Sequence, residues 1–381
     1  MVVAEVVYKL RKENKMLKIQ EFIKTHDNWR ELLSAAPYNL KISEDDGYIL
    51  FKYSQTDSDF NEEICCEARG LILDSTDNFK VVRMAFKKFF NLGEPHAAQI
   101  EWATAWASEK IDGSIMSVWY ARGKWHLSTN GCVDAFKAEI NNPASPYKTY
   151  GELFEAVCPL SNFKNYNKKK CWTFELVSPF TQVVINYPEP DIYLLSIRDT
   201  ETLDELHSEV VEMIGDACGF KTPKHYYFNN EKDYCEFVKN MGDNNEGIVV
   251  CDIDFNRVKI KTEKYIALHR MANNGILTVE RALAMILEND YEEFLAYFPQ
   301  YTDFIYNVID RYDVACREII GVNINVEEWK RKNPSATRKD FSNWVKEHFS
   351  SYAKWAYQAY DGCLTWENKS AKELVRFLGL K

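Results

Sequence analysis

The sequence predicts an α+β fold, in which antiparallel sheets are followed by an all-helical C-terminal domain. From Tyr48 to about Lys261, short runs of β-branched and aromatic residues recur, and helical patterns interrupt them at irregular intervals. This irregular spacing favours antiparallel sheets over a regular β-α-β repeat. After about residue 264 the apolar residues instead follow a 3.6-residue period, which predicts helices up to the C-terminus.

The first part of the chain contains runs with the length and composition of strands. They cover residues 48–53, 69–74, 80–90, 114–120, 125–129, 171–177, 182–187, 192–197, 246–253 and 257–261. An amphipathic helix is expected over 9–25, and further helices near 132–140, 150–157, 203–214 and 231–240. The helical patterns of the tail cover 279–288, 291–298, 304–320, 341–360 and 371–380.

This change of pattern divides the chain into two expected domains. One covers residues 1–272 and includes the N-terminal helix; the other covers residues 273–381 and is helical. Asn273-Asn274-Gly275 is the expected hinge, because Asn and Gly favour turns.

Composition and charge limit the classes of protein that fit. The 46% of hydrophobic residues indicates a globular chain. No apolar run is long enough to cross a bilayer, and the N-terminus lacks a signal-peptide pattern, so we expect a cytoplasmic protein with no membrane partner. The ten cysteines include no C-x-x-C pair and are expected to be reduced thiols. A net charge of −10 argues against a uniformly basic nucleic-acid coat but leaves room for a local basic groove.

The segment Lys110-Ile111-Asp112-Gly113-Ser114 is the most informative motif. A lysine two residues before Asp-Gly, at the start of a strand-like run, is typical of enzymes that carry a nucleotide on a lysine. In that chemistry Lys110 would attack the α-phosphorus of a nucleoside triphosphate. The pattern K-x-D-G is frequent by chance, so the interpretation depends on the residues that follow it.

Such a site needs cations to neutralise a triphosphate. Arg69 precedes a strand, and Lys88 lies in KKFFNL. Lys259 and Lys261 alternate with apolar residues, so they share one face of a strand. Two inward lysines are unfavourable unless an anion meets them, and their charge would favour a neutral amine at Lys110. A surface ion pair for Arg69 and a solvated edge for the lysine pair are the alternative interpretations.

The site also needs carboxylates for ribose and metal. Glu175 is flanked by apolar residues within a strand, where an isolated acid is unusual, and Glu246 opens the strand EGIVV. A satisfied buried acid and an ordinary turn before a strand are the respective alternatives. Each residue alone has an ordinary explanation, but the occurrence of Arg69, Lys88, Lys110, Glu175, Glu246, Lys259 and Lys261 in this order along the chain favours nucleotidyl transfer.

The series EARG, KKFFNL, EKIDGS, TFELVSP, EGIVV and VKIKTEKYIALH resembles the phage RNA ligase 1 family, the ATP-dependent ligases that repair broken tRNA. The resemblance covers about residues 48–270. K-x-D-G, EGIVV and KIK are shared with DNA ligases and capping enzymes. The segments KFFNL, TFELVSPFTQVVINY and KIKTEKYIALH are more particular to the RNA ligase family.

The resemblance implies a nucleotidyltransferase (ligase) domain over 1–272 and RNA recognition by the helical domain over 273–381. It implies that Lys110 takes AMP from ATP, with Phe90 near the base, Glu175 on the ribose, and Mg²⁺ or Mn²⁺ as the metal. The implied nucleotide contacts are Tyr53, Arg69, Lys88, Phe90, Asn130, Glu175, Glu246, Lys259, Lys261 and Tyr265. The implied metal contacts are Asp112, Glu246 and Glu292.

One departure from the family pattern concerns Asn130. Members usually carry a lysine in a Ser-Lys-Gly segment, and here the segment is Ser128-Thr129-Asn130-Gly131. An amide can donate a hydrogen bond to phosphate but brings no charge. Triphosphate affinity or the preferred RNA end is therefore the property that this change is expected to affect.

The implied partner is RNA with 5′-phosphate and 3′-hydroxyl ends, such as a broken tRNA, in a host cytoplasm if the source is viral. The basic stretch 330–339 of the tail, which follows Trp329, is a candidate contact with the RNA backbone, and a solvated inter-helix loop is the alternative. A DNA ligase or a GTP-dependent capping enzyme would share the lysine chemistry, but both normally append a strand-rich OB domain. A non-catalytic RNA-binding protein on a ligase scaffold is the remaining alternative. The sequence does not indicate the oligomeric state.

Overall fold

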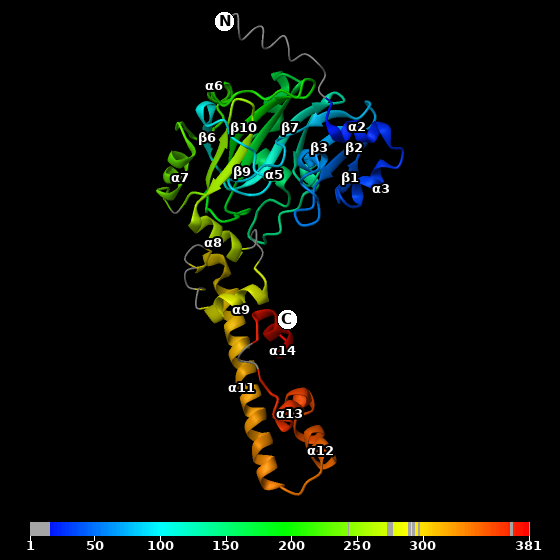
Figure 1. Cartoon of the computed structure of the whole chain (residues 1–381), viewed down its shortest axis with the longest axis vertical. Coiled ribbons are helices and arrows are strands. Elements are labelled where there is room, and N and C mark those ends of the chain that lie inside the picture. The colour runs from blue at the N-terminus through cyan, green and yellow to red at the C-terminus, as the bar shows by residue number, and fades with distance from the viewer. Residues whose placement is uncertain are drawn as a thin grey trace, which may run out of the picture. The chain divides into compact units, whose positions relative to one another are not determined.

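A computed structural model describes residues 16–242, 244–272, 277–288, 291, 294–295, 298–365 and 369–380. The chain divides into two compact units, Met1–Ala267 and Leu268–Lys381. The first unit combines sheets and helices, and the described part of the second contains helices (Figure 1). The predicted fold class, antiparallel sheets followed by a helical tail, is therefore confirmed.

Three sheets form the frame of the first unit, and almost all of their strand pairs are antiparallel. The first sheet has the order β1-β2-β3-β4, with β1 Lys41–Asp45, β2 Tyr48–Lys52, β3 Arg69–Asp74 and β4 Lys80–Arg83. The second has the order β10-β9-β7-β8, with β7 Ser114–Ala121, β8 Lys124–Thr129, β9 Lys170–Val177 and β10 Asp191–Asp199.

The third sheet carries the motif lysines and has the order β11-β6-β12-β13-β5. Its strands are β5 Phe90–Asn91, β6 Trp106–Glu109, β11 His225–Tyr226, β12 Gly247–Cys251 and β13 Arg257–Lys261. The pair β13–β5 is parallel. The pairs β11–β6, β6–β12 and β12–β13 are antiparallel. β6 lies between β11 and β12, so the residue that follows it, Lys110, emerges near the middle of the sheet.

Short helices surround the sheets of the first unit. They are α2 Lys18–Thr25, α3 Trp29–Ser34, α4 Glu63–Glu67, α5 Tyr150–Val157, α6 Ser208–Cys218, α7 Glu231–Lys239 and α8 Glu263–Ala272, which crosses into the second unit. Ile19, Ile23 and Leu33 of α2 and α3 are buried with Phe51 and Leu71 of the first sheet. This apolar contact follows the amphipathic pattern of the sequence.

Some sequence predictions were wrong for identifiable reasons. Residues 182–187 do not form a strand, because the N–H groups of Val184 and Ile185 donate to the side chain of Asp112 instead of a neighbouring strand. The run 80–90 is split, since the chain leaves the first sheet after Arg83 and joins the third at Phe90. Only a 3₁₀ turn, Ala135–Lys137, forms within 132–140.

Other predictions were incomplete. Strands β1, β6 and β11 were missed because KISED, WASE and HY are short and lack the strand pattern. The described part of the N-terminal helix begins at Lys18, and residues 9–15 of that prediction lie outside the described residues. The proposed hinge residues Asn273, Asn274 and Gly275 also lie outside them.

The second unit is described as α9 Val279–Glu288, α11 Thr302–Lys332, α12 Arg338–His348, α13 Ala353–Tyr360 and α14 Ala371–Leu378. α13 packs along the long helix α11. Where α11 meets α12 and α13, the ring centroids of Phe341 and Tyr360 lie 4.1 Å apart, and those of Trp329 and Phe341 lie 5.1 Å apart. No helix in the described ranges is both long enough and apolar enough to span a membrane.

Candidate active site

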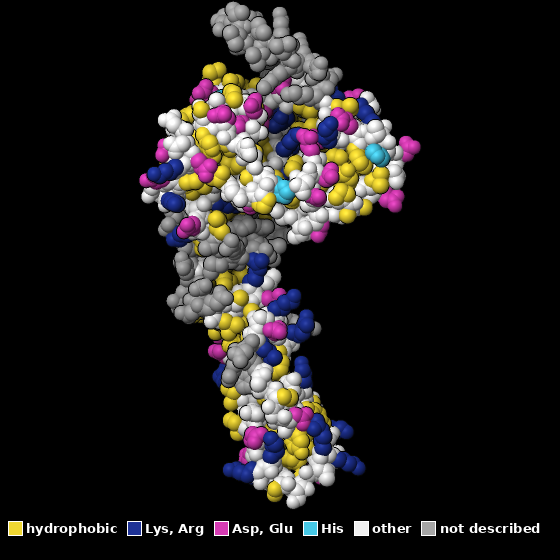
Figure 2. All heavy atoms as spheres, viewed as in Figure 1, with side chains coloured by type: hydrophobic (Ala, Val, Ile, Leu, Met, Phe, Trp, Pro, Cys, Tyr) yellow, Lys and Arg dark blue, Asp and Glu magenta, His cyan; other side chains and the backbone are white. Residues whose placement is uncertain are grey.

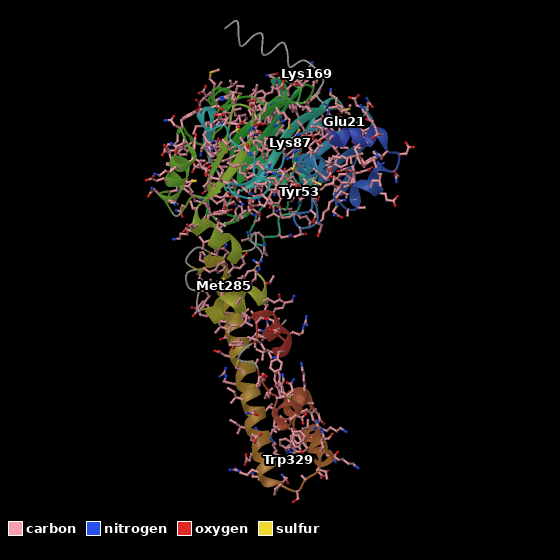
Figure 3. The ribbon with its side chains drawn as sticks, in the orientation of Figure 1. Glu21, Tyr53, Lys87, Lys169, Met285 and Trp329 are labelled. Atoms are coloured by element: carbon pink, nitrogen blue, oxygen red, sulfur yellow. The ribbon has the colours of Figure 1, made fainter. Side chains whose placement is uncertain are left out.

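A cavity of about 200 Å³ lies between the second and third sheets of the first unit. The third sheet contributes Trp106, Ser108, Val249, Cys251, Arg257, Lys259 and Lys261 to its lining, and the second sheet contributes Ile115, Glu175, Leu194 and Leu195. The cavity is also lined by four residues that the sequence analysis singled out: Tyr53, Arg69, Lys88 and Lys110. Glu109, which precedes Lys110, lines it as well. Tyr53, labelled in Figure 3, lies within the body of this unit.

Lys110 and Glu246 form an ion pair at the edge of the cavity. Lys110 follows β6, and its backbone N–H donates to Gly247 O over 2.9 Å, which aligns the start of the motif with β12. The Nζ of Lys110 lies 2.8 Å from Glu246 Oε2, and Lys261 Nζ lies 2.9 Å from Glu246 Oε1. The Glu246 side chain is only 2% exposed, so one buried carboxylate holds two amines of the site.

Strand register explains why the lysine pair faces the cavity. Lys259 lies opposite Val249 and Lys261 opposite Gly247 in the antiparallel pair β12–β13. Gly247 has a φ of 139°, and a Cβ there would collide with the carbonyl oxygen of Ile260, so glycine is required for this close approach. Burial, and then the charges of Lys88 and the other lysines, lower the pKa of Lys259 to about 8.

Lys88 is held in an aromatic cage. Its Nζ lies 4.8 Å from the ring centroid of Tyr53 and 5.2 Å from each of Phe60 and Phe90, and it donates to Gln55 Oε1 over 3.0 Å. Phe90 does not line the main cavity; its ring packs against Phe60 at 5.4 Å. The structure thus places Phe90 beside Lys88 and outside the lining of the main cavity.

Arg69 reaches the cavity from the start of β3. Its guanidinium lies 5.1 Å from the ring centroid of Phe89, and its Nη1 is buried with no hydrogen-bond partner among the described residues. Burial lowers the pKa of Arg69. A buried, unsatisfied guanidinium nitrogen facing a cavity is a suitable contact for an anionic ligand.

Glu175 lies on β9, opposite Ile115 of β7, and is 7% exposed. Burial raises its pKa to about 8, because the ionised form loses its hydration; Lys110 opposes this rise and Glu246 adds to it. A carboxyl group that is protonated near neutral pH can donate as well as accept a hydrogen bond.

Asp112 and Tyr265 are joined by a hydrogen bond. Asp112 Oδ2 accepts from the backbone N–H groups of Val184 and Ile185 over 2.8 and 2.7 Å, and its Oδ1 accepts from the Tyr265 hydroxyl over 2.8 Å. Burial and then Glu246 raise the pKa of Asp112. Both oxygens of Asp112 therefore hold protein groups, which fits the positioning of the motif loop.

Asn130 lies outside the lining of the cavity. Its Oδ1 accepts a hydrogen bond from Arg83 Nη2 over 2.7 Å. Arg83 is fully buried, and it also donates to Ser117 Oγ and to the carbonyl oxygens of Arg69 and Gly70. Asn130 thus supports the start of β3, which carries Arg69. Glu292, the implied metal contact of the tail, lies outside the described residues.

Three acids of the site, Glu175, Glu246 and Asp112, interact with one another. The charges of Glu246 and Asp112 both raise the pKa of Glu175, so the three acids lie close enough to interact. Within the described ranges, no group of three or more His, Cys, Asp or Glu residues is arranged to bind a metal ion directly. A Mg²⁺ ion bound mainly through phosphate oxygens and water is compatible with both observations.

The sequence analysis missed part of the cavity. Glu205 lies within hydrogen-bonding distance of both Arg257 and Arg198, with Nη2–O distances of 2.5 Å, and Glu205 and Arg257 line the cavity. Ser208 and His225 line it as well. These residues lie in segments that carry no motif, so only their proximity in the fold identifies them.

A family model described as RNA ligase matches residues 67–265, slightly more than half of the chain. The chain therefore belongs to this RNA ligase family, and the resemblance to phage RNA ligases is confirmed.

Two viral relatives agree with this assignment. The RNA ligase of Rhodothermus phage RM378 is 26% identical over 397 aligned residues, which cover 86% of this chain and 88% of that protein. A protein of Autographa californica nuclear polyhedrosis virus, provisionally named a bifunctional polynucleotide kinase/RNA ligase, is 26% identical over 74% of this chain and 42% of its own length. An archaeal ATP-dependent RNA ligase of known structure is 13% identical with a TM-score of 0.47, over 96% of this chain and 90% of that one.

Proposed function

We propose that this protein is an ATP-dependent RNA ligase that joins a 5′-phosphate end to a 3′-hydroxyl end through a lysyl-AMP intermediate. The observation that carries the proposal is the position of Lys110, whose amine lies at the cavity edge beside Glu246 and near the lysine pair of β13. Membership of the RNA ligase family supports the choice of RNA.

In the first step, the Lys110 Nζ–phosphorus bond forms as the bond between the α-phosphorus and the bridging oxygen breaks. Pyrophosphate leaves, and Glu246 Oε2, 2.8 Å from the amine, is the nearest group able to take the proton. Lys259, Lys261 and Arg69 would neutralise the departing charge, since phosphoryl-type transfer depends on positioning and electrostatic stabilisation. Glu246 and Asp112 are the acids that would hold Mg²⁺ or Mn²⁺, which would neutralise negative charge on the phosphates.

In the second step the Lys110 amine is the leaving group, and in the third step AMP is. The AMP moves from Lys110 to the 5′-phosphate of an RNA end, which forms a phosphoanhydride and frees the lysine. The 3′-hydroxyl of the other end then attacks that activated phosphate, a phosphodiester forms, and AMP departs. Adenylylation and RNA joining are thus separable reactions of one site.

The test of the lysyl-AMP step is incubation with α-³²P-labelled ATP or GTP and Mg²⁺, followed by a denaturing gel. Label from ATP should appear on the wild-type chain and be lost in Lys110→Ala, while Lys372→Ala on α14 should keep it. Label from GTP instead would favour a capping-type reaction, and labelling that persists in Lys110→Ala would exclude Lys110 as the acceptor.

We further propose that the second unit binds structured RNA such as a broken tRNA, through the end where α11 meets α12. Figure 2 shows Lys and Arg side chains gathered at this end, and Trp329, labelled in Figure 3, lies there. Lys330 and Lys332 pair with acids of their own helix. Arg331 and Lys339 are exposed and have no acid within 4 Å among the described residues, so they are the cations best placed for phosphate.

Charge reversal separates this role from the chemistry of Lys110. Arg331→Glu with Lys339→Glu should lower the rate of joining of a nicked anticodon stem-loop by about tenfold at physiological salt, because two phosphate contacts are lost. Adenylylation with labelled ATP should be unchanged. Lys372→Glu, the same change on α14, is the matched control, and equal joining rates for all three proteins would contradict the proposed RNA contact.

A further inference from the structure

The far end of the main cavity contains two buried polar groups without an assigned role. Ser208 Oγ is buried and has no hydrogen-bond partner among the described residues, whereas His225 Nδ1 is buried and faces the Glu212 carboxylate at 3.5 Å. Both residues line the cavity. An unsatisfied buried polar group is unfavourable, so Ser208 Oγ indicates that a ligand or water completes its hydrogen bond in this cavity.

Strand register places His225 on the opposite side of the cavity from the phosphate-binding lysines. His225 lies opposite Ser108, Ser108 opposite Val249, and Val249 opposite Lys259. Directly opposed residues of neighbouring strands share a face, and these four all line the cavity. Three strand spacings separate His225 from Lys259, which amounts to ~14 Å.

The surface between these two ends is mainly apolar. Ile115, Leu195 and Val249 line the cavity from the two facing sheets. A flat heterocyclic base can be held between such side chains, while its polar edge needs hydrogen bonds. A nucleotide with its phosphates at Lys259 would therefore direct its base toward His225.

The ionisation and tautomer of His225 follow from its surroundings. Burial lowers the pKa of His225, so the ring is neutral at neutral pH. The exposed carboxylate Glu212 lies 3.5 Å from His225 Nδ1 and favours the proton at that nitrogen. Nε2 is then an acceptor, whereas the Ser208 hydroxyl can donate.

We propose that His225 and Ser208 read the base of the bound nucleotide, with His225 accepting from the exocyclic amine of adenine and Ser208 donating to a ring nitrogen. Guanine presents a carbonyl oxygen where adenine has its amine, and two acceptors would then face each other. The pair would thus select ATP over GTP. This inference rests on the proposed use of a nucleotide at this site, but it concerns recognition and not chemistry.

The test compares ATP with purine riboside triphosphate, which lacks the exocyclic amine. Binding to the full chain is measured by calorimetry in EDTA, so that no chemistry is needed. The wild-type chain should bind ATP about 5- to 150-fold more tightly, the range that corresponds to ~1–3 kcal/mol for an unsatisfied polar group. The preference should disappear in His225→Ala and return in part in His225→Gln, whose amide oxygen can accept.

Two further variants complete the test. Ser208→Ala should weaken both nucleotides and keep the preference for ATP, and His26→Ala, an exposed imidazole change on the same unit, should behave as wild type. Because the readout is a ratio within each variant, a partly inactive preparation does not alter it. An unchanged preference in His225→Ala, or no preference in the wild type, would overturn the inference. Failure of labelling at Lys110 with an intact binding preference would refute the proposed chemistry alone.

Discussion

Glu175→Gln should make the protein more stable at pH 8 than the parent, while changing its stability little at pH 5. In the folded chain burial raises the pKa of Glu175 to about 8, whereas the unfolded chain has an ordinary value near 4.5. Between these values the unfolded state ionises and the folded state keeps its proton. The stability of the parent therefore falls as pH rises from about 4.5 to about 8.

The size of the effect follows from the interval between the two pKa values. Roughly 3.5 pH units correspond to roughly 5 kcal/mol of free energy of unfolding. Water penetration and relaxation reduce such values in real proteins, so we expect roughly 2–5 kcal/mol at pH 8. Glutamine has nearly the same shape and no charge, and it does not contribute this pH dependence.

The assay is guanidinium denaturation of the full chain at pH 5, 6.5 and 8, with the free energy of unfolding compared between parent and variant. The difference should grow with pH in favour of Glu175→Gln. Glu236→Gln, an exposed change on α7, should show no such trend. A difference that is the same at all three pH values, or a variant less stable than the parent at pH 8, would refute the reasoning.

Two further predictions concern charge. Because the pKa of Lys259 is lowered to about 8, this side chain loses its charge as pH rises from 7 to 9. The affinity for a non-hydrolysable ATP analogue, measured by calorimetry, should therefore fall by about tenfold over that range. This fall should be absent in Lys259→Gln and smaller in Lys259→Arg. Asn130→Lys should lower the free energy of unfolding by about 1–3 kcal/mol, because Arg83 loses its acceptor, and Asn130→Asp should not. Denaturation that gave the lysine variant the stability of the parent would contradict the second prediction.

The sequence analysis predicted the orientation and burial of side chains well where local pattern and chemistry coincide. The alternation of Lys259 and Lys261 with apolar residues predicted a shared face, and both lysines line the cavity. The isolated acid Glu175 was expected to be special because of its apolar neighbours, and it is buried beside the motif lysine. In both cases a period of two residues was enough to predict orientation.

Prediction failed where long-range contacts override local preference. Residues 182–187 have the composition of a strand, but two of their backbone N–H groups donate hydrogen bonds to the Asp112 side chain and not to a neighbouring strand. Phe90 is aromatic and close to Lys88 in the sequence, yet strand pairing with Val258 directs it away from the main cavity. Neither contact can be predicted from residue spacing. The Asp112 contact joins segments more than 70 residues apart. The position of Phe90 depends on which sheet a two-residue strand joins.

Ser208 and His225 show a different limit. Neither lies in a motif, and single Ser and His residues are common in any sequence. Their significance appears only when the fold brings both to one cavity, where Ser208 Oγ is buried without a partner among the described residues. The same holds for Arg83, whose complete burial has no signal in the run KVVRMAF.

The bond between Arg83 and Asn130 also has an evolutionary consequence. A lysine at position 130 would remove the acceptor of Arg83 Nη2 and bring a second cation to a fully buried guanidinium. The order of change would matter: replacement of Arg83 by a neutral residue must come first, and only then does a cation at 130 become tolerable. The identity of residue 83 therefore limits which side chains position 130 can carry.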